Sequence, residues 1–159
     1  MYMAMKLLHL LAVVLFLGNT ITAIFWKVRA DRSADLRVMA HTLEGIIQAD
    51  RLFTLPGVVL LTIFGFGAAG IGRLPIFGTG WIFWSIVLFL ISAAAYMGGV
   101  SPAQKKMAAL ARAATGSADF DAARYRALSR NWNLWGTIAL LAPIAATALM
   151  VLKPALPGI

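Results

Sequence analysis

The chain has 159 residues, of which 61% are hydrophobic and 13% are charged. This composition predicts one compact domain and leaves almost no room for an additional soluble domain. It has no cysteine, which excludes disulfides, thiolate metal sites and a cysteine nucleophile. The net charge of +8 comes from basic residues that flank hydrophobic stretches, which favours anionic lipid as the partner and argues against nucleic acid.

Four long stretches lack Asp, Glu, Lys and Arg: Leu7–Trp26, Leu52–Ile71, Leu74–Val100 and Trp132–Leu152. A spanning helix needs roughly 20 apolar residues to cross about 30 Å of hydrocarbon. The sequence therefore predicts an all-α, membrane-embedded four-helix bundle. It forms a single transmembrane domain over residues 1–159, with spans at 7–26, 52–71, 80–100 and 132–152. The first stretch exceeds the roughly 7–15 apolar residues of a signal peptide, so we expect a retained helix.

The basic residues are distributed unevenly around these spans. Eleven of the 14 lie between spans one and two or between spans three and four, and the other three are Lys6, Arg73 and Lys153. Because basic loops stay in the cytoplasm, both termini are predicted to lie outside it. The expected location is the bacterial cytoplasmic (inner) membrane, with several passes.

Both cytoplasmic loops are predicted to contain helices. Between spans one and two, an apolar stripe at helical spacing indicates an amphipathic helix over residues 34–50; the stripe is Leu36, Met39, Leu43, Ile46 and Ile47. Between spans three and four, Ser101 is predicted to cap a helix that ends at Gly116. Asp119 or Asp121 then caps a further helix that leads into the fourth span.

Small residues spaced four apart predict which spans pack together. Gly65 with Ala69 on the second span and Ala94 with Gly98 on the third form such pairs, which favour close packing of these two helices. Pro56 and Pro143 lie within predicted spans.

His9 is the main titratable side chain inside the apolar stretches. A polar side chain in lipid normally faces the protein interior and indicates a functional site, and imidazole can ligate haem iron. The alternative is a neutral histidine that is hydrogen-bonded to a neighbouring helix. His41 is not expected to ligate the same iron, because the 17 helical steps from His9 to Trp26 already cover about 25 Å.

Five other residues are candidates. Asn19 and Thr20 are polar within the first span, where they can bond another helix or line a small cavity. His41 and Glu44 are three apart on the predicted loop helix, but two ligands without a third make a weak metal site. Asp50 and Arg51 precede the second span, as a local ion pair or as a tether for the loop. No carboxylate for a proton relay is expected within the membrane.

Several of these segments resemble a bacterial integral-membrane family of unknown function, domain-of-unknown-function family 2269. The resemblance rests on Lys6–Leu11, Leu17–Gly18 and Ala49–Gly57 and extends over nearly the whole chain. That family is similar in layout to the HemJ-type protoporphyrinogen oxidases and CopD-type copper-resistance proteins. The HemJ-type resemblance implies a b-type haem at the position of His9, although the third span here offers no His or Lys.

Three functional hypotheses follow. The absence of catalytic groups and the small-residue faces favour a non-enzymatic accessory protein, alone in the bilayer, as a homo-oligomer or as a subunit of a larger membrane complex. The second is a haem b membrane redox protein that uses His9. The third is a protein that handles a metal or small solute in a cavity at His9 and Asn19. Whether the chain is an enzyme stays open.

Overall fold

The computed structural model describes residues 1–115 and 120–158, and every element within them is helical. The elements are α1 (Tyr2–Ser33), α2 (Leu36–Ala49), η1 (Asp50–Thr54), α3 (Leu55–Ile71), α4 (Gly80–Ala95), η2 (Tyr96–Val100), α5 (Ser101–Ala114) and α6 (Ala122–Leu152). The π-helical turns η1 and η2 join their neighbours without a break. The described residues thus form four long helices, each apolar enough to cross a membrane, which confirms the predicted all-α fold.

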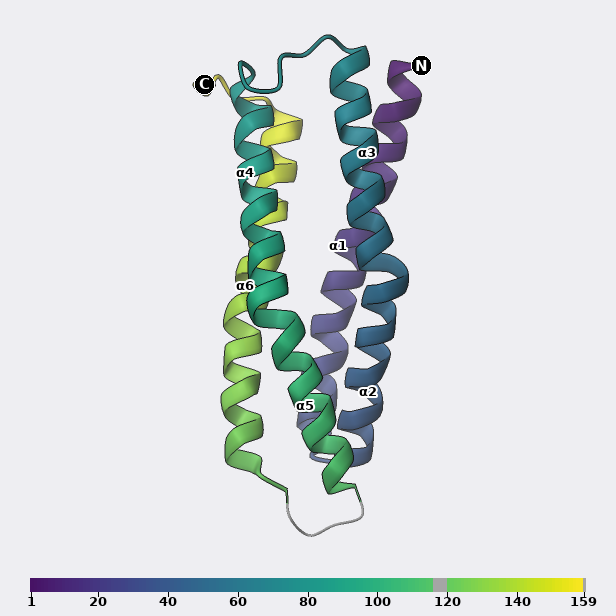
Figure 1. Cartoon of the computed structure of the whole chain (residues 1–159), viewed down its shortest axis with the longest axis vertical. Helices are drawn as coiled ribbons and strands as arrows, with labels where there is room; N and C mark the ends of the chain where they lie inside the picture. Colours follow the sequence, from purple (N-terminus) through teal and green to yellow (C-terminus); the bar gives the residue numbers. More distant parts are fainter. Residues whose placement is uncertain (116–119, 159) are drawn as a thin grey trace.

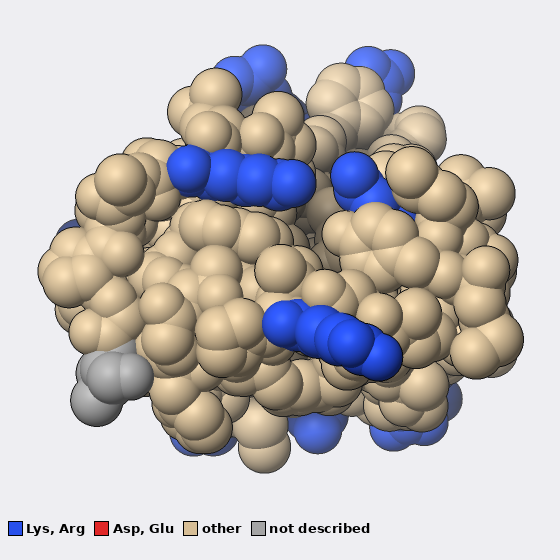
Figure 2. Space-filling model, turned by 90° about the horizontal axis from the view of Figure 1, so that it is seen from above, with Lys and Arg blue, Asp and Glu red and all other residues tan. Residues whose placement is uncertain are grey.

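The four helices run up and down, and both chain ends lie at the same end of the bundle (Figure 1). We call this the terminal end, and the opposite one, with the α1–α2 turn and the α5–α6 connection, the loop end. Figure 2 looks onto the terminal end and shows basic side chains but no acidic ones. That the loop end faces the cytoplasm stays a prediction from the charges.

Two helix pairs make up the terminal half of the bundle. There α1 packs on α3 and α4 packs on α6, whereas no described residue brings the backbone of α3 into contact with that of α4 or α6. The predicted packing of the second span on the third is therefore wrong. Gly65 of α3 faces His9 of α1, and Gly99 of η2 faces Trp135 of α6. A small-residue motif permits close approach but does not specify which helix approaches.

In the loop half the two pairs come together. Here α2 packs on α5, and α1 and α6 complete the bundle. The core contains Leu43 of α2, Met107 and Ala111 of α5, and Trp132 of α6, all nearly inaccessible to solvent. This arrangement explains the apolar stripe of residues 34–50, which packs inside the bundle while His41 and Arg37 stay exposed.

The helix ends follow local chemistry at two points and depart from prediction at a third. The Asp35 and Asp121 side chains accept the backbone N–H of Arg37 and Arg124, each at 2.8 Å, and so cap α2 and α6. Ser101 does not cap a helix, because one helix continues through it from α4 into α5. The α5 helix ends at Ala114. Gly116 and Asp119 lie outside the described residues.

Each π-helical turn comes just before a proline. Leu55 donates its N–H to the Asp50 carbonyl and Ser101 to the Tyr96 carbonyl, both five residues back, and Pro56 and Pro102 follow directly. Because proline lacks an N–H and its ring presses on the preceding turn, a widened turn accommodates it inside a continuous helix.

Pro143 is accommodated differently, inside α6. It cannot donate to the Ala139 carbonyl four residues earlier, and the Ser92 hydroxyl of α4 donates to that carbonyl at 2.7 Å instead. The proline therefore creates a bonding position between α4 and α6.

Candidate functional site

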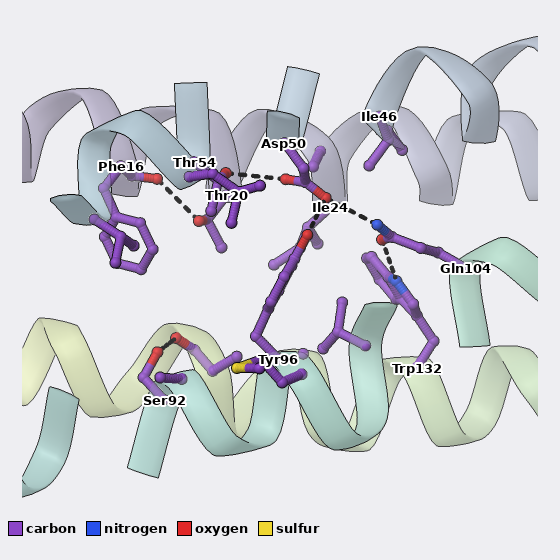
Figure 3. Close-up of a pocket in the computed structure, with 18 of the residues that line it drawn as sticks. Phe16, Thr20, Ile24, Ile46, Asp50, Thr54, Ser92, Tyr96, Gln104 and Trp132 are labelled. Atoms are coloured by element: carbon purple, nitrogen blue, oxygen red, sulfur yellow. Dashed lines mark hydrogen bonds between the residues drawn. The ribbon is translucent and has the colours of Figure 1, made fainter. Parts of the chain in front are cut away.

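Asp50 is the centre of a polar cluster inside the bundle. Asp50 is only 6% exposed, and its two carboxylate oxygens accept four hydrogen bonds, of which Figure 3 shows those from Thr54, Tyr96 and Gln104. Thr54 Oγ1 and Asn19 Nδ2 donate to Oδ1 at 2.9 and 3.2 Å, while Tyr96 Oη and Gln104 Nε2 donate to Oδ2 at 2.9 Å each. All four donors are neutral, so no cationic side chain among the described residues pairs with this carboxylate.

The two π-helical turns and their flanks supply this cluster. Asp50 is the first residue of η1 and Tyr96 the first of η2, and the Tyr96 side chain reaches across the bundle to Asp50 (Figure 3). Gln104 follows on α5, and its Oε1 accepts the indole N–H of Trp132 at 3.2 Å. The two hydrogen bonds, one from Gln104 to Asp50 and one from Trp132 to Gln104, fix the orientation of the Gln104 amide. Gln104 thereby links Asp50 to α6.

The depth of Asp50 follows from its partner on α1. Asn19 lies well inside the uncharged stretch of α1 and also donates to Thr54 Oγ1 at 2.8 Å. Asp50 is therefore level with the apolar part of α1, although it precedes the uncharged stretch of its own helix. The uncharged stretches of the sequence did not indicate this position of the Asp50 carboxylate.

Arg51 does not pair with Asp50. Its side chain is exposed, on the outside of the helix whose interior face carries Asp50, and no ion pair joins the two among the described residues. A long arginine side chain at this depth can extend along the helix toward the interface. The predicted local ion pair therefore does not form, because Asp50 faces the interior of the bundle and Arg51 faces outward.

A cavity of about 110 Å³ lies beside the cluster, between the two helix pairs. All four long helices contribute to its walls, which are almost entirely apolar; Asp50, Thr54 and Gln104 line it, and the Tyr96 side chain crosses from the opposite helix to reach Asp50 (Figure 3). Toward the terminal end, Phe16 of α1 meets Phe89 of α4 edge to face, with ring centroids 6.3 Å apart. Thr20 also lines the cavity, and its hydroxyl donates to the Phe16 carbonyl of its own helix.

A second polar cluster surrounds Lys27, nearer the loop end. Lys27 is 1% exposed, pairs with Asp31 at 2.7 Å, donates to Ser129, and lies 5.1 Å from the ring centroid of Trp132. Tyr125 donates to Asp31 at 2.7 Å. The sequence placed Lys27 among the basic residues between spans one and two, and only its spacing of four from Asp31 could have indicated a buried ion pair. Its charge is compensated by Asp31 and is therefore not available to Asp50.

The sequence model of a family described as a predicted integral membrane protein, DUF2269, matches residues 3–154. The chain belongs to this family. No curated protein and no solved structure matches it. The description of DUF2269 states membrane integration and no activity, and the match includes both polar clusters. The chain is accordingly a multi-pass integral membrane protein in contact with the lipid bilayer.

His9 lies apart from the cavity. Its Nδ1 is 2.8 Å from the Leu61 carbonyl oxygen on α3, so this nitrogen carries the hydrogen, and its ring packs against Gly65, where an added Cβ would come within 3.0 Å. The surroundings of His9 in this structure do not fit a haem, because α3 packs directly against the imidazole ring. Ligation of haem through Nε2 of His9 stays a prediction. His41 is exposed on α2, and the described residues contain no group of three metal-binding side chains.

His9→Leu is expected to lower the free energy of unfolding by about 1 kcal/mol, because one interhelical hydrogen bond is lost. Detergent unfolding curves measure this loss. Absorbance of the purified protein, before and after addition of haem, separates the two roles of His9. A purely structural histidine predicts no Soret band in either case, and a band that His9→Leu abolishes would assign His9 to haem instead.

Proposed function

We propose that this protein binds a small organic cation in the cavity between its helix pairs, with Asp50 as the residue that recognises the charge. The observation that carries this proposal is a buried carboxylate that borders an apolar cavity and has only neutral partners. Ionisable groups inside membrane proteins are costly, and they commonly mark binding sites. This develops the small-solute hypothesis, with Asp50 and Asn19 at the site in place of His9 and Asn19.

The charge of the ligand follows from the electrostatics. A carboxylate without a nearby cation creates a negative potential that the apolar walls screen poorly. The hydroxyls of Thr54 and Tyr96 each donate to Asp50; Thr54 also accepts from Asn19, and each hydroxyl oxygen keeps at least one lone pair that can accept an N–H group from a ligand. An ammonium group therefore finds both a compensating charge and acceptors, whereas an anion would be repelled.

The size of the ligand follows from the cavity. An engineered cavity of about 150 Å³ binds benzene, and the cavity here is smaller, at about 110 Å³. A short alkylammonium ion of about five or six non-hydrogen atoms fits this space, with its chain against Phe16 and Phe89 and its charge toward Asp50. A fully apolar molecule of the same size would leave the negative charge of Asp50 without compensation.

Handling such a solute requires no catalytic group, and it is compatible with a protein that acts alone, as a homo-oligomer or as an accessory subunit. The distribution of basic residues supports a cytoplasmic position for the loop end of the bundle. Asp50 then lies nearer to the cytoplasmic side of the membrane than to the outer side. Localisation in a bacterial inner membrane belongs to the same proposal.

Isothermal titration of the detergent-solubilised protein with n-butylammonium and with 1-butanol tests the proposal. We expect butylammonium to bind at least about tenfold more tightly than the alcohol, and Asp50→Asn to remove that difference, because a charged hydrogen bond is lost. Glu44→Gln removes an equal charge from the surface and should change nothing. Equal binding of amine and alcohol, or an amine affinity that survives in Asp50→Asn, would refute the charge recognition.

A further inference from the structure

A separate site lies on the outer surface of α1, close to the loop end. An open hollow of about 560 Å³ runs along the helix there, lined by Ile24, Phe25, Val28, Arg29, Arg32 and Ser33. From these residues we infer that the hollow binds an anionic phospholipid, whose phosphate contacts the two arginines and whose acyl chain lies along the apolar residues. Of its lining residues only Ile24 also lines the cavity beside Asp50, and both arginines lie outside that cavity.

The charges of Arg29 and Arg32 are uncompensated within the described part of the chain. Neither guanidinium makes an ion pair there, in contrast to Lys27 and Arg112, which pair with Asp31 and Glu44. The two nearest acids have other partners. Asp31 accepts hydrogen bonds from Tyr125 and Ser129 inside the bundle, and Asp35 caps the start of α2. Arg29 and Arg32 are three residues apart on a helix, about 5–6 Å between Cβ atoms, so one phosphate can contact both.

The order of the side chains along α1 matches the orientation of a lipid. Trp26 ends the uncharged stretch of about 30 Å, and Arg29 and Arg32 follow about 4 and 9 Å beyond it. This is the depth of the headgroup layer. Phe25, 56% exposed, precedes the arginines toward the hydrocarbon, as does the half-buried Ile24. A soluble anion would use only the arginines, whereas a phospholipid uses both parts of the hollow.

Native mass spectrometry of the full chain, with phosphatidylglycerol and phosphatidylcholine added in detergent, tests this site. We expect retention of phosphatidylglycerol over phosphatidylcholine, and an affinity for phosphatidylglycerol about thirtyfold lower in the double variant Arg29→Gln/Arg32→Gln, from about 1 kcal/mol per basic residue. The matched control, Arg126→Gln/Arg130→Gln, removes the same charge from exposed positions of α6 at the same end but outside the hollow. It should stay within about threefold of the unaltered chain.

Phe25→Ala separates lipid from free anion. It should weaken retention of phosphatidylglycerol while leaving the weak binding of inorganic phosphate unchanged. Equal losses in the two double arginine variants would show a general attraction to charge and overturn the site. So would inorganic phosphate that binds as tightly as the lipid. Unaltered unfolding temperatures of the variants in detergent ensure that lost binding does not reflect lost folding.

Discussion

Asp50→Ala is expected to destabilise the protein by about 3 kcal/mol or more. The substitution leaves the donors of Asn19, Thr54, Tyr96 and Gln104 without their shared acceptor, in a region that water enters poorly. Each buried polar group that loses its partner costs about 1–3 kcal/mol. Asp50→Asn should cost less, because the amide oxygen can still accept, although its NH₂ group faces two donors. Reversible unfolding by SDS titration in mixed micelles measures both changes.

Glu44→Ala is the matched control for this substitution. Glu44 pairs with Arg112 at 3.2 Å on the surface, where both side chains are substantially exposed, and such pairs contribute about 0–1 kcal/mol. If Asp50→Ala loses no more free energy of unfolding than Glu44→Ala does, then the polar cluster around Asp50 does not hold the two helix pairs together.

Gly99→Ala and Gly98→Ala are expected to differ by about 2 kcal/mol although they are adjacent. A Cβ at Gly99 would overlap the Cβ and Cγ of Trp135, atoms close to the backbone of α6 that cannot swing aside. Overpacking of this kind costs about 1–3 kcal/mol. At Gly98 an added Cβ meets nothing within 4 Å, so alanine should be neutral or slightly stabilising in a helix. The unfolding titration described above ranks the two variants.

A double-mutant cycle attributes the effect to this contact. Trp135→Gly should cancel most of the penalty of Gly99→Ala, since it removes both the indole and the Cβ that overlap the added methyl group. If Gly99→Ala is as stable as Gly98→Ala, then η2 and α6 do not pack as closely as described.

The spans and the helical class were predictable because apolar length and the absence of charge are properties of single segments. Packing is a property of pairs, and Gly65 or Gly99 carries no signal that names its neighbour. Counting uncharged windows also placed Asp50 in a loop, since a window ends at the first charge. One helix continues through Asp50, however, and a continuous helix can turn a polar residue at the end of its apolar stretch toward the interior.

The candidate site was only half predictable for a related reason. Asn19 was recognisable because a polar residue stands out within an apolar stretch. Tyr96, Gln104 and Lys27 did not stand out, because each lies near a predicted boundary where polar residues are common. Their roles depend on the widened turns η1 and η2, which alter the helical register in a way that 3.6-residue periodicity does not reveal.

The division into two helix pairs has a consequence for how the protein is made. Each pair consists of helices that are close in sequence, α1 with α3 and α4 with α6, so the first hairpin can assemble in the bilayer before the second leaves the ribosome. Until the second hairpin docks, Asp50 in the first hairpin lacks its two hydrogen-bond donors from the second, Tyr96 and Gln104. We therefore expect biogenesis to end with the docking of two halves, and the buried carboxylate to acquire its full set of hydrogen bonds only at that final step.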